Sequence, residues 1–120
     1  MNSEDFVEAL KRHVGDAVIE DTIACLKQPP GRRVPPEERV RSDWYNALTT
    51  EEAEHVNSAI ATAVHGTLFG LLAMLDGART IDDEGGRFEL AYVANQRVVL
   101  NDSQAIGLHD LLNAEPVNNR

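Results

Sequence analysis

The segment from Ala59 to Leu75 carries no formal charge except that of a protonated His65, and it is the one stretch that resembles a membrane span. A spanning helix needs about 20 mainly apolar residues, usually with Lys or Arg near one end. This segment is shorter, and acids flank it: Glu51, Glu52, Glu54 and Asp76. We therefore expect a core helix of a water-soluble protein and no membrane association.

Signals at both ends extend this helix over residues 50–76. Thr49 and Glu52 have the spacing of a capping box, in which each side chain accepts a hydrogen bond from the other residue's backbone N–H. Gly77 supplies a stop, because glycine readily adopts the left-handed conformation that ends helices. Beyond Val64 almost every direction around the helix is apolar, which is typical of a helix surrounded by protein. The sequence thus predicts one long, buried central helix.

Three shorter helices are predicted ahead of it. The first begins near Ser3 and ends near Gly15, and Asp16 then caps a second helix that runs to the prolines at 29 and 30. A break between them predicts an N-terminal helical hairpin. Residues 28–36 contain four prolines and form a loop, after which a short helix begins near Pro36.

After the central helix, the pattern changes to that of strands. Residues 87–93 place Phe88, Leu90 and Tyr92 on one face, and a turn leads into a second strand over residues 97–101. A two-stranded hairpin is marginal in water by itself, so we expect it to pack on the central helix. A last short helix follows a cap at Asp102 or Ser103.

The chain length of 120 residues suits one domain. We predict a helix-dominated α+β fold in a single domain, residues 1–113, followed by a flexible C-terminal tail, residues 114–120. In chain order the domain contains an N-terminal helical hairpin, one long central buried helix, a β-hairpin packed on it and a short C-terminal helix. One cysteine, Cys25, excludes an internal disulfide, and the N-terminus lacks the pattern of a signal peptide. A cytoplasmic location is expected.

The formal net charge of −9 is unevenly distributed along the chain. Residues 27–41 carry a net charge of +3, so the remainder carries −12. A strongly negative field disfavours binding to nucleic acid or to an anionic membrane, and it favours a basic protein partner. Acidity also keeps a protein soluble, which is the simpler explanation of the charge.

The sequence contains no recognisable catalytic, metal or cofactor motif, so no catalytic residue, metal or cofactor is assigned and an enzymatic role is not expected. The best candidate for a ligand pocket lies between the central helix and the hairpin. His65 shares a helix face with Asp76, which could orient its imidazole, and Tyr92 would approach from the hairpin. The alternative is a core histidine that is hydrogen-bonded to the backbone or to a carboxylate.

Small residues form one stripe along the central helix, and they predict close contact with another helix. A glycine within a helix costs about 0.5–1 kcal/mol relative to alanine, so a packing role would offset the cost. The partner helix is expected to come from a second copy in a twofold homodimer, although the other helices of the same chain could also provide it. The residues of the stripe are Ala59, Ala63, Gly66, Gly70, Ala73 and Gly77.

Two functional hypotheses follow from these patterns. The first is a non-enzymatic protein-interaction module with an acidic surface. Bacterial immunity proteins, which neutralise toxins, are similar in size and charge, but this is an analogy of class and not a match of motif. The second is a small-molecule-binding protein or enzyme that uses the predicted pocket.

Overall fold

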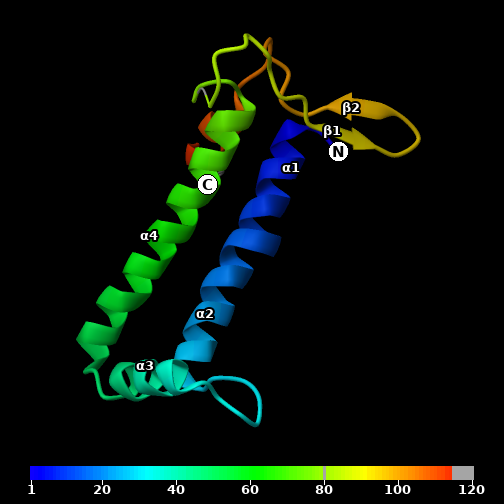
Figure 1. Ribbon diagram of the computed structural model, residues 1–120. Coiled ribbons are helices and arrows are strands. Elements are labelled where there is room, and N and C mark those ends of the chain that lie inside the picture. The colour runs from blue at the N-terminus through cyan, green and yellow to red at the C-terminus, as the bar shows by residue number, and fades with distance from the viewer. Residues whose placement is uncertain (80, 115–120) are drawn as a thin grey trace, which may run out of the picture.

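The computed structural model describes residues 1–79 and 81–114, and it confirms a helix-dominated α+β fold (Figure 1). A long central helix, an antiparallel hairpin of two strands and a short C-terminal helix all occur, as predicted. Within the described residues the helical segments are α1 Ser3–Leu10, η1 Lys11–Asp16, α2 Ala17–Lys27, α3 Pro36–Asn46, α4 Thr50–Leu75 and α5 Leu108–Asn113. The strands are β1 Ala91–Val93 and β2 Arg97–Val99. The predicted tail lies outside the described residues, apart from Ala114.

The break predicted at Gly15 and Asp16 is wrong, because α1, η1 and α2 follow one another as a continuous rod. Asp16 has helical backbone angles and makes no capping hydrogen bond. Gly15 is buried, and a Cβ atom there would lie 3.2 Å from Cδ1 of Leu68 on α4. The glycine therefore serves close approach of two helices and does not end one of them.

The N-terminal helices that pack together are instead α2 and α3, with their turn at residues 28–35. The amide of Asn46 donates a hydrogen bond to the carbonyl of Lys27 at 2.9 Å, which satisfies an oxygen at the end of α2. The four prolines of the loop region explain why the turn lies here. The rod and α4 run side by side, and α3 closes one end of the space between them (Figure 1).

The start of α4 is confirmed in detail. The hydroxyl oxygen of Thr49 accepts a hydrogen bond from the backbone N–H of Glu52 at 3.1 Å, and Oε1 of Glu52 accepts one from the N–H of Thr49 at 2.8 Å. The backbone N–H of Thr49, followed by its hydroxyl group, lowers the pKa of the Glu52 carboxyl. At the other end, Gly77 has a φ of 80°, as the predicted stop requires.

Replacing Thr49 by Ala should lower the free energy of unfolding by about 1 kcal/mol, because the cap of α4 is lost. Thr50 is exposed and next in the chain, so Thr50→Ala is the matched control and should stay within about 0.5 kcal/mol of wild type. Urea denaturation followed by circular dichroism measures both. Equal effects of the two substitutions would show that the cap contributes nothing.

The hydrogen bonds between Thr49 and Glu52 also make the stability of the protein depend on pH. Because the pKa of Glu52 is lower in the folded state, the unfolded state binds more protons, and the contribution of Glu52 to stability is present above the ordinary glutamate pKa. It is lost as the pH falls through the lowered pKa. An NMR titration of the Glu52 carboxyl should show this lowering in wild type and a smaller one in Thr49→Ala.

The hydrophobic core lies at one end of the molecule, where α1, α4 and α5 meet. Its buried residues are Val7, Leu72, Leu108 and Leu112. In α4 only Leu72 and Ala73 are buried, so the prediction that protein surrounds the apolar half of this helix is wrong within a single chain. Among the described residues, the rod and α5 cover parts of α4 and leave the rest open.

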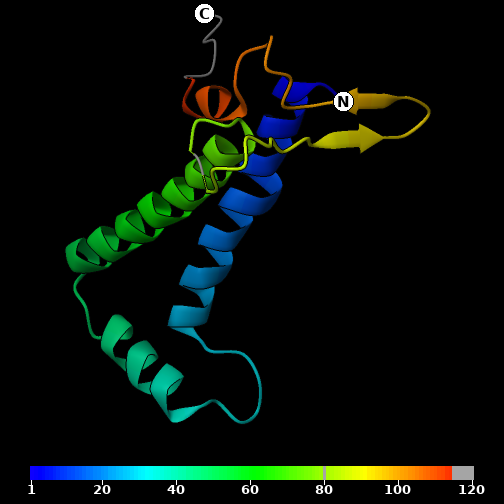
Figure 2. The same ribbon diagram turned by 45° about the horizontal axis from the view of Figure 1, so that its top comes forward.

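The β-hairpin is shorter than predicted and pairs Tyr92 with Val98 in antiparallel register. Only its base contacts the body of the protein. Leu100 is buried, and the amide of Asn101 donates a hydrogen bond to the carbonyl of Leu75 at 2.7 Å. The strands themselves project away from the helices (Figure 2), and Phe88 and Tyr92 are exposed. The expectation that the Phe88–Tyr92 face packs on α4 is therefore wrong.

Candidate interaction face

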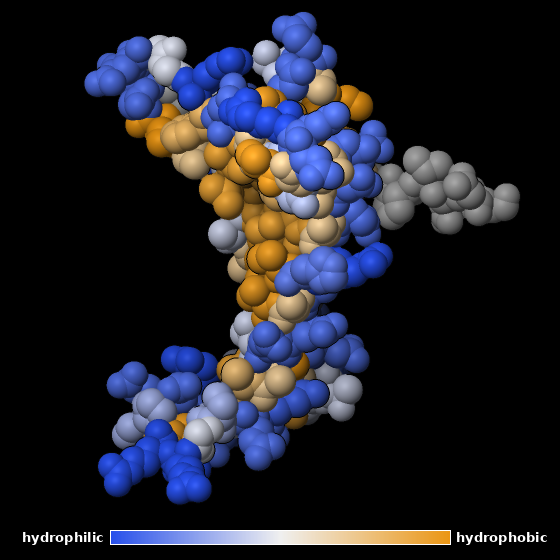
Figure 3. Space-filling model, turned by 90° about the vertical axis from the view of Figure 1, so that its right-hand side faces the viewer, coloured by the Kyte–Doolittle hydropathy of each residue, from blue (hydrophilic) through white to orange (hydrophobic). Residues whose placement is uncertain are grey.

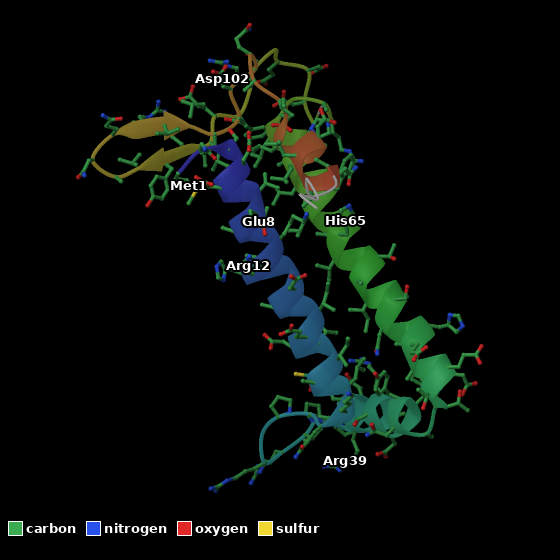
Figure 4. The ribbon with its side chains drawn as sticks, turned by 180° about the vertical axis from the view of Figure 1, so that it is seen from behind. Met1, Glu8, Arg12, Arg39, His65 and Asp102 are labelled. Atoms are coloured by element: carbon green, nitrogen blue, oxygen red, sulfur yellow. The ribbon has the colours of Figure 1, made fainter. Side chains whose placement is uncertain are left out.

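The structure does not bring the three predicted pocket residues together. His65 projects from α4 (Figure 4), is exposed, and its Nε2 donates a hydrogen bond to Oδ1 of Asn113 at 2.8 Å. Asp76 is hydrogen-bonded to His109 instead of His65. Tyr92 is exposed on the projecting hairpin. The alternative of a core histidine bonded to backbone or to a carboxylate does not fit either, because His65 is exposed and its partner is the side-chain amide of Asn113.

Asp76 instead joins the end of α4 to the start of α5. Its Oδ2 accepts a hydrogen bond from the backbone N–H of His109 at 2.9 Å and lies 2.5 Å from ring atom Nδ1 of the same residue. The N-cap of α5 is Gly107, which has no side chain, so Asp76 provides the cap from a distant part of the chain. Phe69 packs edge-on against the imidazole, with ring centroids 5.5 Å apart. The pair is a structural joint.

Sequence reasoning missed this joint because its residues are 33 positions apart. Asp76 shares a helix face with His65, and that local signal favoured the wrong histidine. A glycine at the N-cap of a short helix is the only local sign that α5 needs an outside acceptor.

Half of the small-residue stripe is open to solvent. Ala59, Ala63 and Gly66 are exposed, and no heavy atom of the described residues lies within 4 Å of a Cβ placed on Gly66. Closer to the core, a Cβ on Gly70 would lie 3.3 Å from the guanidinium of Arg79, Ala73 is buried, and Gly77 forms the helix stop. Around Gly66, the stripe therefore makes no close contact with another helix in the part of the chain that the structure describes.

Beside this exposed stretch lies an apolar groove of about 530 Å3 where α2, α3 and α4 meet. Val56 and Ile60 of α4 line it, and Ala63 lies on the same side of α4 because residues three, four and seven apart share a helix face. The full lining is Asp21, Thr22, Cys25, Leu26, Glu38, Arg41, Trp44, Val56 and Ile60. We call this groove, together with Ala59, Ala63 and Gly66, the open face.

Trp44 separates the groove from a second hollow on the other side of α3. It lines both, together with Arg41, and 54% of its surface is exposed. Val40, one helical turn earlier, is 69% exposed and lines the second hollow. Trp44, the only tryptophan of the sequence, therefore points outward and does not fill the edge of the core.

The molecule is more open than its length requires. Its radius of gyration is 18.4 Å, whereas a compact chain of this length has a value of about 14 Å. Its accessible surface is 9092 Å2, whereas about 6,400 Å2 is typical of a monomer of 13.2 kDa. Figure 3 shows a hollowed side with apolar surface through its middle and polar surface at both ends.

Among the described residues, α4 is the helix whose length and composition would allow it to cross a membrane, and 11% of its most apolar window is buried. Three acids lie in its first two turns: Glu51, Glu52 and Glu54. The basic residue Arg39 lies at the opposite end of the molecule from Asp102 (Figure 4).

Within residues 1–79 and 81–114, no three Cys, His, Asp or Glu side chains converge on a metal site.

Comparison of the chain with protein family models, with curated protein sequences and with solved structures found no match.

Proposed function

We propose that this protein is a non-enzymatic protein-interaction module whose open face is covered by another polypeptide. The observation that supports the proposal best is the exposure of apolar side chains around the groove, above all that of Trp44. A contiguous apolar surface of this kind is costly to leave in water and typically marks a binding site. Exposed tryptophans at such sites contribute strongly to association.

The polar residues of the groove support a binding role over catalysis. Three charged residues, Asp21, Glu38 and Arg41, line the groove, while its remaining lining is largely apolar. Protein-binding surfaces likewise combine an apolar part with a few polar and charged residues. The overall charge of −9 favours a basic protein as a functional partner. Small acidic immunity proteins that neutralise toxins offer an analogy. Association with such a partner should slow steeply as salt is added.

Photo-crosslinking inside cells tests whether a polypeptide covers the open face. Thr22 is exposed and lines the groove, so a photoreactive phenylalanine derivative placed there would meet an occupant. Glu20 lies on the same helix, is exposed and is outside the groove, which makes it the matched control. We expect a protein adduct from position 22 that is at least several times more abundant than that from position 20.

The mass of the adduct then separates the possible occupants. An adduct that forms equally at positions 20 and 22, or no adduct at either, would contradict the proposed function. The cells should be grown and irradiated with the full chain at its natural abundance, because overproduction drives weak self-association by mass action.

A further inference from the structure

We propose that the occupant of the open face is a second copy of this chain, which packs its own α4 and Trp44 against the first in a twofold symmetric dimer. This inference rests on the proposed function and names the occupant of the open face, while the basic partner proposed above would bind acidic surface that the dimer leaves exposed. The first argument is the size of the uncovered surface. The whole chain, with the projecting hairpin included, exposes roughly 2,700 Å2 more than a compact monomer of its mass, and the open face contributes part of this surplus. Obligate dimers bury about 2,000–5,000 Å2 in total, so two such chains have enough surplus surface for a stable interface.

The second argument is self-complementarity. In a twofold dimer each copy presents the identical surface to the other. The same patch must therefore contain both a projecting side chain and a groove that receives it. The open face has both parts: Trp44 projects from α3, and the groove beside it has an apolar floor of Leu26, Val56 and Ile60. A groove of about 530 Å3 is large enough for an indole side chain with neighbouring residues.

The third argument is the exposed part of the small-residue stripe, which adjoins the groove. Ala63 and Gly66 allow another helix backbone to approach α4 closely, and Gly66 meets nothing within the described residues of its own chain. A helical glycine without an internal contact costs stability and gains nothing in a monomer. Contact with the α4 of a second copy would offset that cost.

Charge favours an antiparallel pairing of the two α4 helices. Glu51 and Glu54 lie near the start of α4, so a parallel pair would bring like charges together. In an antiparallel pair these acids lie beside the uncharged second half of the other helix. A lipid surface fits less well, because the apolar surface seen in Figure 3 lies on a hollowed side of the molecule.

Sedimentation velocity of the full chain tests the proposal. Wild type at micromolar concentration should sediment at twice the chain mass of 13.2 kDa. Gly66→Leu and Trp44→Glu should each raise the dimer dissociation constant at least about tenfold. Both sites are open in the monomer, so circular dichroism should show unchanged helix content. Ser58 is exposed on another side of α4, and Ser58→Leu should leave the dimer intact.

A wild type that is monomeric at 100 µM, or a dimer that both variants leave unchanged, would overturn the second copy as occupant. So would a monomer that binds vesicles of phosphatidylcholine and phosphatidylglycerol through Trp44. Failure of this inference remains distinct from failure of the proposed function. A monomeric wild type with a position-22 adduct of another mass refutes self-association alone, whereas the absence of any adduct refutes both.

Discussion

Replacing Leu72 by Ala should lower the free energy of unfolding by about 3–5 kcal/mol. Leu72 is 1% exposed and belongs to the small cluster that joins α1, α4 and α5. Removing most of its side chain leaves a cavity that the surrounding helices can fill only in part. Domain stabilities are about 5–15 kcal/mol, so a chain with so few buried residues would lose much of its total. Urea denaturation at fixed protein concentration measures the loss.

The adjacent residue provides the matched control. Leu71 is 47% exposed on the same helix, so Leu71→Ala should cost less than about 1 kcal/mol. If Leu72→Ala does not fold, Leu72→Met should still fold with a cost below about 1.5 kcal/mol, because the volume is conserved. Similar costs for Leu71→Ala and Leu72→Ala would show that the buried cluster is not where the stability lies.

Those parts of the fold that depend on local chemistry could be predicted from the sequence. The capping box of Thr49 and Glu52 and the stop at Gly77 act within one helical turn, and both ends of α4 were placed to within one residue. The prolines near position 30 likewise placed the loop before α3. Each signal acts on the backbone within a few residues, so these helix ends can be predicted without knowing where any other element packs.

Predictions that depended on distant contacts failed for one common reason. The sequence predicts a helix end at Gly15. A glycine can end a helix or allow a neighbouring helix to approach closely, and the sequence alone does not distinguish these two roles. The real environment of Gly15 is Leu68, which lies on another helix. The apolar pattern of α4 predicts that its surface is buried against protein. The pattern does not indicate whether that protein belongs to the same chain or to another one. Self-association of the stripe residues accordingly stays a prediction.

The start of α5 shows how a distant contact can replace a local signal. Asp102 and Ser103 were expected to cap this helix, yet it begins at Leu108, after Gly107. The acceptor that the first turn needs comes from Asp76 at the end of α4. The sequence therefore contains a suitable capping residue, but at a position from which only the folded chain can bring it to α5.

Replacing Asp76 by Ala should lower the free energy of unfolding by about 2–3 kcal/mol. The carboxylate is 7% exposed, and its Oδ2 accepts from both the backbone N–H and the ring of His109. Without it, α5 loses its cap and its attachment to α4, and the buried side chains of Leu108 and Leu112 lose their position in the core. Hydrogen exchange should accelerate in α5 far more than in α3, which lies at the other end of the molecule.

Two further variants separate the cap from the side-chain pair. Asp76→Asn keeps an oxygen that can accept from the backbone N–H of His109, so it should cost about half as much as Asp76→Ala. His109→Ala keeps the cap but removes the ring contact with Phe69, for which about 0.5–1.5 kcal/mol is expected. An Asp76→Ala protein whose α5 exchanges at the wild-type rate would contradict the joint, because α5 would then be held by its leucines alone. The joint and the buried cluster both lie at the end of the molecule away from Trp44, so these variants should leave any association through the open face unchanged while they weaken the fold.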